Sequence, residues 1–217
     1  MDRRDRFRRR PQRRKPYHSK GPQKKKQFIK KSRPVIILDV LPHGHPDNLE
    51  KPSWAKTPLA QVLTSEDFVL YEVKLADKHA NTKVQEKNLY EEFLKQGKLR
   101  EVLKKIDYKD LTNTSKALLQ PILEEEVREY EEKFITFFNK STSITPRMHA
   151  LKLIPGIGNK HMWQILEARE KQQFVTFQDI SDRTSVSNPP KQLALRIIKE
   201  LQRDVKYYLF SKTQKYE

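Results

Sequence analysis

The first 33 residues set the strongest limit on what this chain can fold into, because they are rich in lysine and arginine and almost free of aliphatic side chains. The net charge of the 217-residue chain is +17, and most of that excess lies in residues 1–33. Such a segment cannot bury enough apolar surface to offset the entropy lost on ordering. We therefore predict a disordered basic arm at 1–33 and a folded part from residue 34 onward.

The arm has the composition of a nucleic-acid-binding segment. Its arginines offer forked donors to phosphates, and its few aromatic rings offer surfaces on which bases can stack. We favour RNA, because arginine-rich disordered arms often fold onto its irregular surfaces. A solubilising or localisation tail, or attraction to anionic lipid, is the alternative. The expected contacts are Arg3, Arg4, Arg8, Arg9, Arg10, Arg13, Arg14, Lys24, Lys25 and Lys26.

Composition excludes several other classes of protein. No run approaches the roughly 20 apolar residues of a membrane span, and the N-terminus lacks the apolar stretch of a signal peptide. We expect a soluble, cytoplasmic protein without a membrane partner. The absence of cysteine excludes disulfides and thiolate metal sites and fits a reducing compartment. We expect no cofactor and no metal.

The pattern of apolar and β-branched residues predicts a β-rich unit at residues 34–110. Val35–Leu41 reads as a buried strand, and Ala60–Leu63 with Phe68–Leu75 reads as a hairpin. Val69, Tyr71, Val73 and Leu75 alternate with Glu72 and Lys74, which predicts that one face of the hairpin is buried.

The long loop before this hairpin contains residues that could bind ligands. His43 and His45 lack a third metal ligand nearby in sequence, so we interpret them as ordinary loop histidines. Trp54 could stack on a base, although a tryptophan that packs the proline-rich loop onto the β unit is the favoured interpretation.

Residues 111–143 are predicted to be a linking helical segment. Pro121 is expected to open a helix, and an apolar stripe runs from Leu123 to Phe138. Its glutamates, from Glu124 to Glu132, read as a solvated face near the positive end of the helix dipole. A sharper hypothesis is that these glutamates hold the basic arm when no nucleic acid is bound.

Residues 144–217 contain two of the five glycines of the chain in the string "PGIG". "PRMHALKLI" is predicted to be a short helix, "PGIG" a tight turn and "NKHMWQILEAR" a second helix with Met162, Ile165 and Leu166 inward. Two glycines allow positive φ and leave the backbone uncovered. The free N–H groups at the start of the second helix would favour a phosphate. The predicted phosphate site is Gly156, Ile157, Gly158, Asn159 and Lys160, with Ile157 plugging the angle between the helices.

This pattern resembles the helix-hairpin-helix motif, which grips nucleic-acid backbone without reading bases. An αα-corner that merely needs two glycines is the structural alternative. Downstream, a short helix at Phe177–Arg183 and a helix carrying Leu193, Ile197 and Leu201 inward suggest a second unit. Its connection "TSVSNPP" lacks glycine, so we expect it to pack against the first unit and contribute little to phosphate binding.

The order of these elements resembles an archaeal family known as domain of unknown function 655, described as putative RNA-binding or nucleotide-binding proteins. The strings that carry the resemblance are "LDVLPHGHP", "PLAQV", "DYKDLT", "FFN", "SITPRMHALKLIPGIGNKHMWQILEAR" and "KYYLF". The resemblance implies an α+β fold in which an OB-like small β-barrel precedes helices that bear the hairpin. It also implies genes near those of ribosomal proteins, and hence rRNA or another structured RNA as ligand. One segment departs from the family pattern, because residues 78–103 read as partly helical.

No catalytic motif is present, and "PGIG" is too short to be a nucleotide-binding fingerprint. Asp39 with Asp107 or Asp110 could in principle hold Mg²⁺, but their spacing gives no support. We therefore predict a non-catalytic, ribosome-associated RNA-binding protein that uses the arm, the OB-like face and the hairpin. The alternative is a protein-interaction module on ribosomal proteins or the transcription machinery, with the arm as a nonspecific clamp for polyanions.

Overall fold

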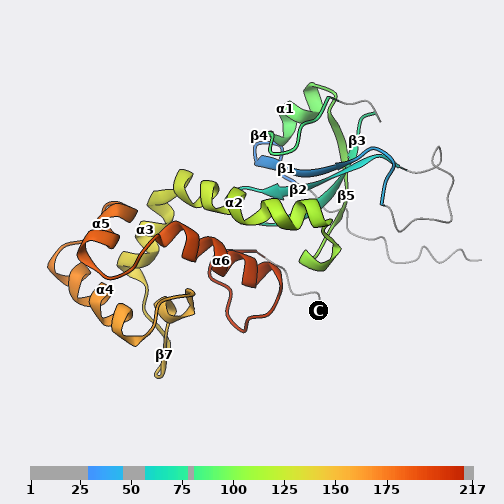
Figure 1. Cartoon of the computed structure of the whole chain (residues 1–217). Coiled ribbons are helices and arrows are strands. Elements are labelled where there is room, and N and C mark those ends of the chain that lie inside the picture. The colour runs from blue at the N-terminus through green and yellow to red at the C-terminus, as the bar shows by residue number, and fades with distance from the viewer. Residues whose placement is uncertain (1–28, 46–56, 78–80, 213–217) are drawn as a thin grey trace, which may run out of the picture.

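The computed structural model describes residues 29–45, 57–77 and 81–212 (Figure 1). The predicted arm contacts between Arg3 and Lys26, and Trp54, lie outside these residues. An antiparallel sheet comes first and a mostly helical region follows, so the predicted α+β class is confirmed. No helix in the three described ranges is long and apolar enough to cross a membrane.

The sheet has five strands in the order β4-β1-β2-β3-β5, and every neighbouring pair is antiparallel. The helix α1 (Tyr90–Lys95) connects the two edge strands and contacts both of them. Within the described residues β4 and β5 do not pair, so the closed small barrel implied by the resemblance is not observed. The strands are β1 (Pro34–Leu41), β2 (Leu59–Thr64), β3 (Leu70–Leu75), β4 (Lys87–Leu89) and β5 (Leu99–Lys105).

Both faces of the sheet are buried, whereas the alternation in the hairpin predicted a single buried face. Val73 and Leu75 pack with Phe93 of α1 on one face. Leu70 packs on the other face with the helical region, in the same cluster as Leu123. The pattern was misleading because this second face is covered by a helix that follows much later in sequence.

The long helix α2 (Asn113–Glu129) lies between the sheet and the last helix, α6 (Pro189–Leu201), as Figure 1 shows. Thr112 caps its N-terminus by accepting a hydrogen bond from the Ser115 N–H at 3.1 Å. The prediction that Pro121 opens a helix is wrong, since Pro121 lies inside α2. Packing on both sides of α2 outweighs the main-chain hydrogen bond that a proline removes.

The apolar stripe predicted as one helix is divided at Tyr130, whose φ of −100° and ψ of 36° are not helical. A second helix, α3 (Glu131–Lys140), begins there and buries Phe134 and Phe138.

The glutamates of this segment, which we predicted to form a solvated face, are only partly exposed to solvent. Glu126 is 2% exposed and pairs with Lys87 of β4.

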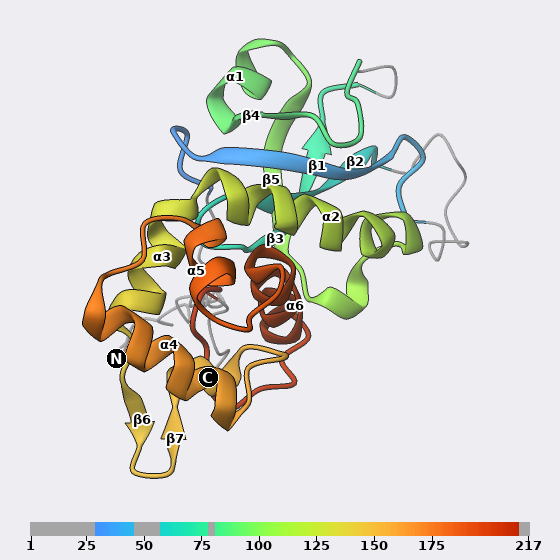
Figure 2. The same ribbon diagram turned by 60° about the vertical axis from the view of Figure 1, so that its left-hand side comes forward.

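The remaining elements form the end of the molecule away from the sheet. Figure 2 shows the two-stranded hairpin β6–β7 projecting below α4, while α5 and α6 lie between α4 and α2 in this view. One core cluster extends through the whole molecule, from Leu63 in the sheet through Leu123 to Ile197 in α6. The elements at this end are β6 (Ser143–Thr145), β7 (Met148–His149), η3 (Ala150–Leu153), α4 (Asn159–Lys171) and α5 (Phe177–Arg183), whereas η2 (Tyr108–Asp110) joins β5 to α2 beside the sheet.

Candidate nucleic-acid interface

The first arm of the glycine hairpin is a short helix, as predicted, but it is the 3-10 helix η3 and covers only Ala150–Leu153 of "PRMHALKLI". Met148 and His149 are used by the β6–β7 hairpin, which leaves four residues before the chain extends at Ile154. A residue before proline disfavours helical backbone, so Pro155 ends the element. The His149 ring caps η3, with Nδ1 accepting from the Leu151 N–H at 3.2 Å.

The turn itself needs left-handed backbone at one glycine. Gly156 has a φ of +84°, as predicted, but Gly158 has a φ of −88° and is extended, so the expectation of positive φ is wrong for Gly158. A Cβ at Gly158 would meet no atom within 4 Å, whereas one at Gly156 would lie 3.2 Å from Gln192. Gly158 therefore leaves its backbone uncovered, and Gly156 shapes the turn. Ile157 is 4% exposed and plugs the core, as predicted.

The N-terminus of α4 opens directly from this turn. Gly158 is its N-cap, and no side chain caps it. The first main-chain hydrogen bond runs from the Met162 N–H to the Gly158 carbonyl at 3.0 Å, so the preceding N–H groups are available to a ligand. Asn159 and Lys160 are exposed beside them. His161 pins the turn, because its Nδ1 lies 2.8 Å from the Gly156 carbonyl oxygen.

Trp163 adds an aromatic surface that sequence reasoning missed. It is 59% exposed, and it follows Lys160 by three residues, which places both on one face of α4. Side chains on a helix lean towards its N-terminus, which directs Trp163 towards the turn that carries Asn159 and Lys160. The periodicity could have revealed this, because Met162 and Ile165 point inward and leave residue 163 outside.

The second hairpin unit, α5 and α6, does not offer a comparable site. Asn188 takes the left-handed conformation with a φ of 46°, and its side chain caps α6 by accepting from the Lys191 N–H at 3.3 Å. Pro189 and Pro190 occupy the first helical positions and carry no N–H. Leu193, Ile197 and Leu201 point inward as predicted and share a core cluster with Ile157 and Met162, but the most extensive contacts of α6 are with α2.

A buried ion pair on α6 holds the glycine hairpin in place. Arg196 and Glu200, with side chains 5% and 0% exposed, pair at 3.0 Å. Arg196 also donates to the Leu153 carbonyl at 3.2 Å and to the Tyr207 carbonyl. Glu200 accepts three main-chain N–H groups at 2.8 to 3.0 Å, from Leu209, Phe210 and Ser211.

Two further sets of hydrogen bonds hold α4 and the loop that follows it. The Arg169 guanidinium donates to the carbonyls of Phe138 and Ser141, both at 2.9 Å, and so ties α4 to the end of α3. Asn139 forms a reciprocal pair with the main chain of Phe174, with both distances 2.9 Å. The position of the hairpin is therefore set by polar contacts as well as by the core.

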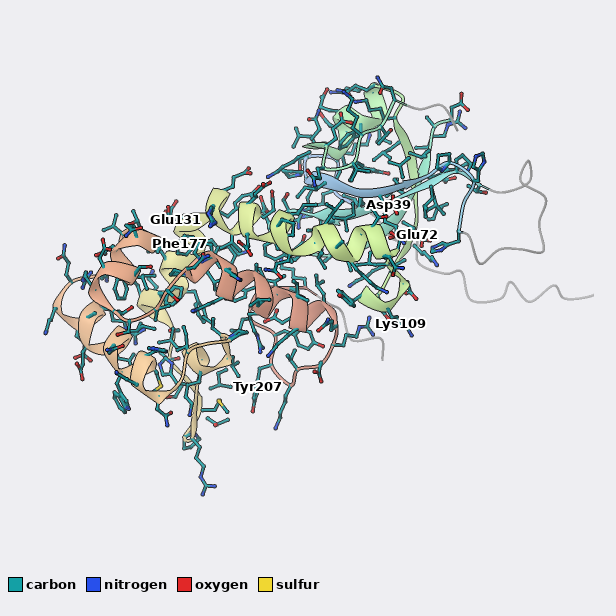
Figure 3. The ribbon with its side chains drawn as sticks, in the orientation of Figure 1. Asp39, Glu72, Lys109, Glu131, Phe177 and Tyr207 are labelled. Carbon is teal, nitrogen blue, oxygen red and sulfur yellow. The ribbon has the colours of Figure 1, made fainter. Side chains whose placement is uncertain are left out.

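On the sheet, a polar row crosses four strands. Asp39, Gln61, Glu72 and Lys104 are cross-strand neighbours on β1, β2, β3 and β5, and Figure 3 shows Asp39 and Glu72 near the start of α2. Glu72 is 2% exposed and is reached by the His45 ring at 2.6 Å and by Lys104 at 3.3 Å. Asp39 accepts from the Thr112 hydroxyl at 2.6 Å.

This row does not form a metal centre. Asp107 pairs with Arg203 at 2.6 Å, and the Asp110 carboxylate accepts the Asp107 N–H, so neither joins Asp39. No group of three or more metal-ligating side chains occurs in the part of the chain that the structure describes. His45 is a loop residue whose Nε2 lies 2.6 Å from a carboxylate oxygen of Glu72.

The fold and the hairpin define a class of α+β proteins in which an antiparallel sheet is followed by a helical region with an exposed glycine turn. The chain belongs to the family described as protein of unknown function (DUF655), whose model matches residues 31–212. It is 35% identical over 206 residues to the uncharacterized protein MJ0038 of Methanocaldococcus jannaschii, covering 91% of each chain. The crystal structure of Af1531 from Archaeoglobus fulgidus is similar with a TM-score of 0.72 at 34% identity, over 82% of this chain and 99% of that one.

Proposed function

We propose that this protein is a non-catalytic RNA-binding protein that grips the sugar-phosphate backbone at Gly156–Lys160. The observation that carries the proposal is the uncovered main chain at Gly158, which opens onto the uncapped N-terminus of α4. N–H groups and a positive dipole end favour a phosphate there. Lys160 supplies a cation on the same face, and Trp163 supplies a surface for a base.

Two further contacts complete the proposal. The basic arm tethers the protein to RNA, which makes hairpin binding intramolecular and raises the overall affinity. The sheet acts as an OB-like unit through its loop ends, because its two faces are occupied by packing against α1 and the helical region. Ribosomal or another structured RNA is the ligand that fits an arginine-rich arm combined with a backbone grip.

The decisive variant is Gly158→Ala. Its φ of −88° and the open space around a Cβ mean that the added methyl strains nothing in the free protein. The methyl would occupy the space through which a phosphate approaches the main chain. We expect an unchanged melting temperature and RNA affinity lowered by roughly fivefold to thirtyfold, which corresponds to about 1 to 2 kcal/mol. Unchanged affinity in the folded variant would remove the hairpin from the mechanism.

A matched pair of lysines on α4 tests the same site electrostatically. Lys160 and Lys171 are both exposed, at opposite ends of the helix. Replacing Lys160 by Gln should reduce the slope of log affinity against log salt by about 0.7 to 0.9, as expected for one phosphate contact. Lys171→Gln removes the same charge away from the hairpin and should have a smaller effect.

A protein-interaction module is the second candidate function. Val175, in the loop between α4 and α5, is 72% exposed, and Ile144 of β6 is 37% exposed. In this alternative, these two side chains contact the protein partner. Such docking would depend weakly on salt, whereas RNA binding through phosphates weakens steeply as salt rises.

A further inference from the structure

A groove of about 450 Å³ lies where the end of the basic arm meets the C-terminal segment. Arg33 forms one side, the β2–β3 turn forms another, and the junction of α2 and α3 contributes Tyr130 and Lys133. The segment Tyr208–Lys212 closes it. This volume is within the range of pockets that bind small ligands, and it is large enough for one nucleotide.

The carboxylates of the groove are engaged by a single cation. Arg33 pairs with Asp67 and lies 4.0 Å from a carboxylate oxygen of Glu66. Lys133 instead donates to the main-chain carbonyl of Glu66, and its ammonium lies 5.2 Å above the Phe68 ring. Across the three described ranges of the chain, neither Lys133 nor Lys212 forms an ion pair with a carboxylate. Neither ammonium group is therefore in direct contact with a carboxylate of the described residues, although Glu66 and Asp67 act on Lys133 at longer range.

Lys133 and Lys212 line the same groove, and the charge of Lys212 acts on Lys133. Burial is the largest cause of a lowered pKa at Lys133, and the nearby charges of Lys212 and Arg33 lower it further, against the opposing effect of Glu66 and Asp67. Positive charges that crowd a groove in this way are stabilised when an anion binds between them. An anion bound between Lys133 and Lys212 would offset this repulsion.

Aromatic rings and chain connectivity favour a nucleotide over a simple ion. Tyr130 and Tyr208 line the walls of the groove, and each ring can contact a base or a ribose. Residues 1–28 join the described chain at Ile29, four residues before Arg33. An RNA strand held by the arm would therefore pass close to the groove.

We propose that this groove binds one phosphate-bearing nucleotide of the RNA strand, with Lys133 and Lys212 holding its phosphate and Tyr130 and Tyr208 contacting its base or sugar. The inference rests on the proposed function and adds a second RNA site. Arg196 connects the two sites, because it binds the Leu153 carbonyl before the glycine turn and the Tyr207 carbonyl beside the groove. Their relative position is therefore fixed in the free protein.

The test compares two double variants of the full-length chain, Lys133→Gln with Lys212→Gln and Lys109→Gln with Lys116→Gln. The control pair removes the same charge near the N-terminal end of α2, where Figure 3 labels Lys109. Lys116 lies 14 residues before Tyr130, which is about 21 Å along a helix. The probe is a fluorescent single-stranded RNA titrated at several salt concentrations. We expect the groove variant to bind about tenfold more weakly than the control, with a salt slope smaller by about 0.7.

A second measurement uses the wild-type chain, so it does not depend on the folding of a variant. RNA containing 4-thiouridine is crosslinked to the protein and the modified peptides are identified. Crosslinks at Tyr130 or Tyr208 would support the groove. Equal affinities of the two double variants, together with crosslinks confined to the arm and α4, would overturn it while leaving the proposed function intact.

Two other results distinguish failure of the proposed function from failure of the nucleotide assignment. If the wild-type chain shows no salt-dependent RNA binding, the proposed function and the groove fail together. If polyglutamate displaces RNA from the wild-type chain and loses affinity in the groove variant as strongly as RNA does, the groove is a site for acidic peptides and the nucleotide assignment is overturned.

Discussion

Replacing Glu200 by Gln should destabilise the protein more than any surface substitution. The carboxylate is fully buried and accepts three main-chain N–H groups in addition to the Arg196 guanidinium. An amide keeps only one acceptor oxygen, so at least one main-chain donor faces an N–H group instead. Each unsatisfied buried donor costs about 1 to 3 kcal/mol, and the uncompensated arginine adds to this. We expect a loss of about 3 to 5 kcal/mol, as for other broken buried ion pairs.

Urea unfolding of the full-length chain, followed by circular dichroism, measures this loss. The matched control is Glu91→Gln, which neutralises a carboxylate of an exposed i,i+4 pair with Lys95 on α1 and should leave the unfolding midpoint unchanged. Hydrogen exchange should also rise at residues 150–160 and 207–211, since the ion pair holds both segments. A destabilisation below about 1 kcal/mol would show that the pair does not organise this end of the fold.

Three other predictions follow from single contacts. Asn139→Ala removes both hydrogen bonds to the main chain of Phe174 and should lower the free energy of unfolding by about 1 to 3 kcal/mol, measured by urea unfolding. Burial, and secondarily Arg169, lower the pKa of His149 from its ordinary value of 6.5. The unfolded chain therefore takes up this proton first, so stability should fall as pH drops below 6.5, and less so in His149→Gln. Trp163→Ala should weaken binding of single-stranded RNA by about 1 to 3 kcal/mol in a fluorescence titration and affect duplex RNA less.

Local patterns predicted most of the elements but few of the contacts between them. The strand at Val35–Leu41, the hairpin of β2 and β3, and the helices α4, α5 and α6 were all predicted from periodicity and turn residues. Glu72 shows the limit of this reasoning. Alternation placed it on an open face, yet its partners, His45 and Lys104, are far away in sequence, so no local signal could indicate its burial.

The candidate site was predictable to a similar degree. "PGIG" indicated an exposed turn and an open helix N-terminus, and it placed Ile157 in the core. Gly158 is extended because it is the N-cap of α4, a position whose backbone is ordinarily extended, and the expectation of positive φ overlooked this. The groove beside Lys133 carries no sequence signal at all, because its residues come from four separate segments.

The strings that carry the family resemblance divide into two kinds once the structure is considered. Five of them contribute hydrogen-bonding groups to buried contacts between elements: "LDVLPHGHP", "PLAQV", "DYKDLT", "FFN" and "KYYLF". Asp39 and Gln61 bind the residues that begin α2, Asn139 holds the loop before α5, and the C-terminal segment satisfies Glu200. These five strings therefore describe how the fold is assembled.

The glycine hairpin is different. Gly156, Gly158, Asn159 and Lys160 are exposed, and a side chain at Gly158 would touch nothing in the protein. The free protein needs glycine at 156 for its left-handed backbone, but it has no such need at 158. The proposed phosphate site supplies a reason for glycine at 158, because a phosphate that approached the main chain there would meet the added methyl group. Gly158→Ala therefore distinguishes the proposed binding turn from a purely structural corner.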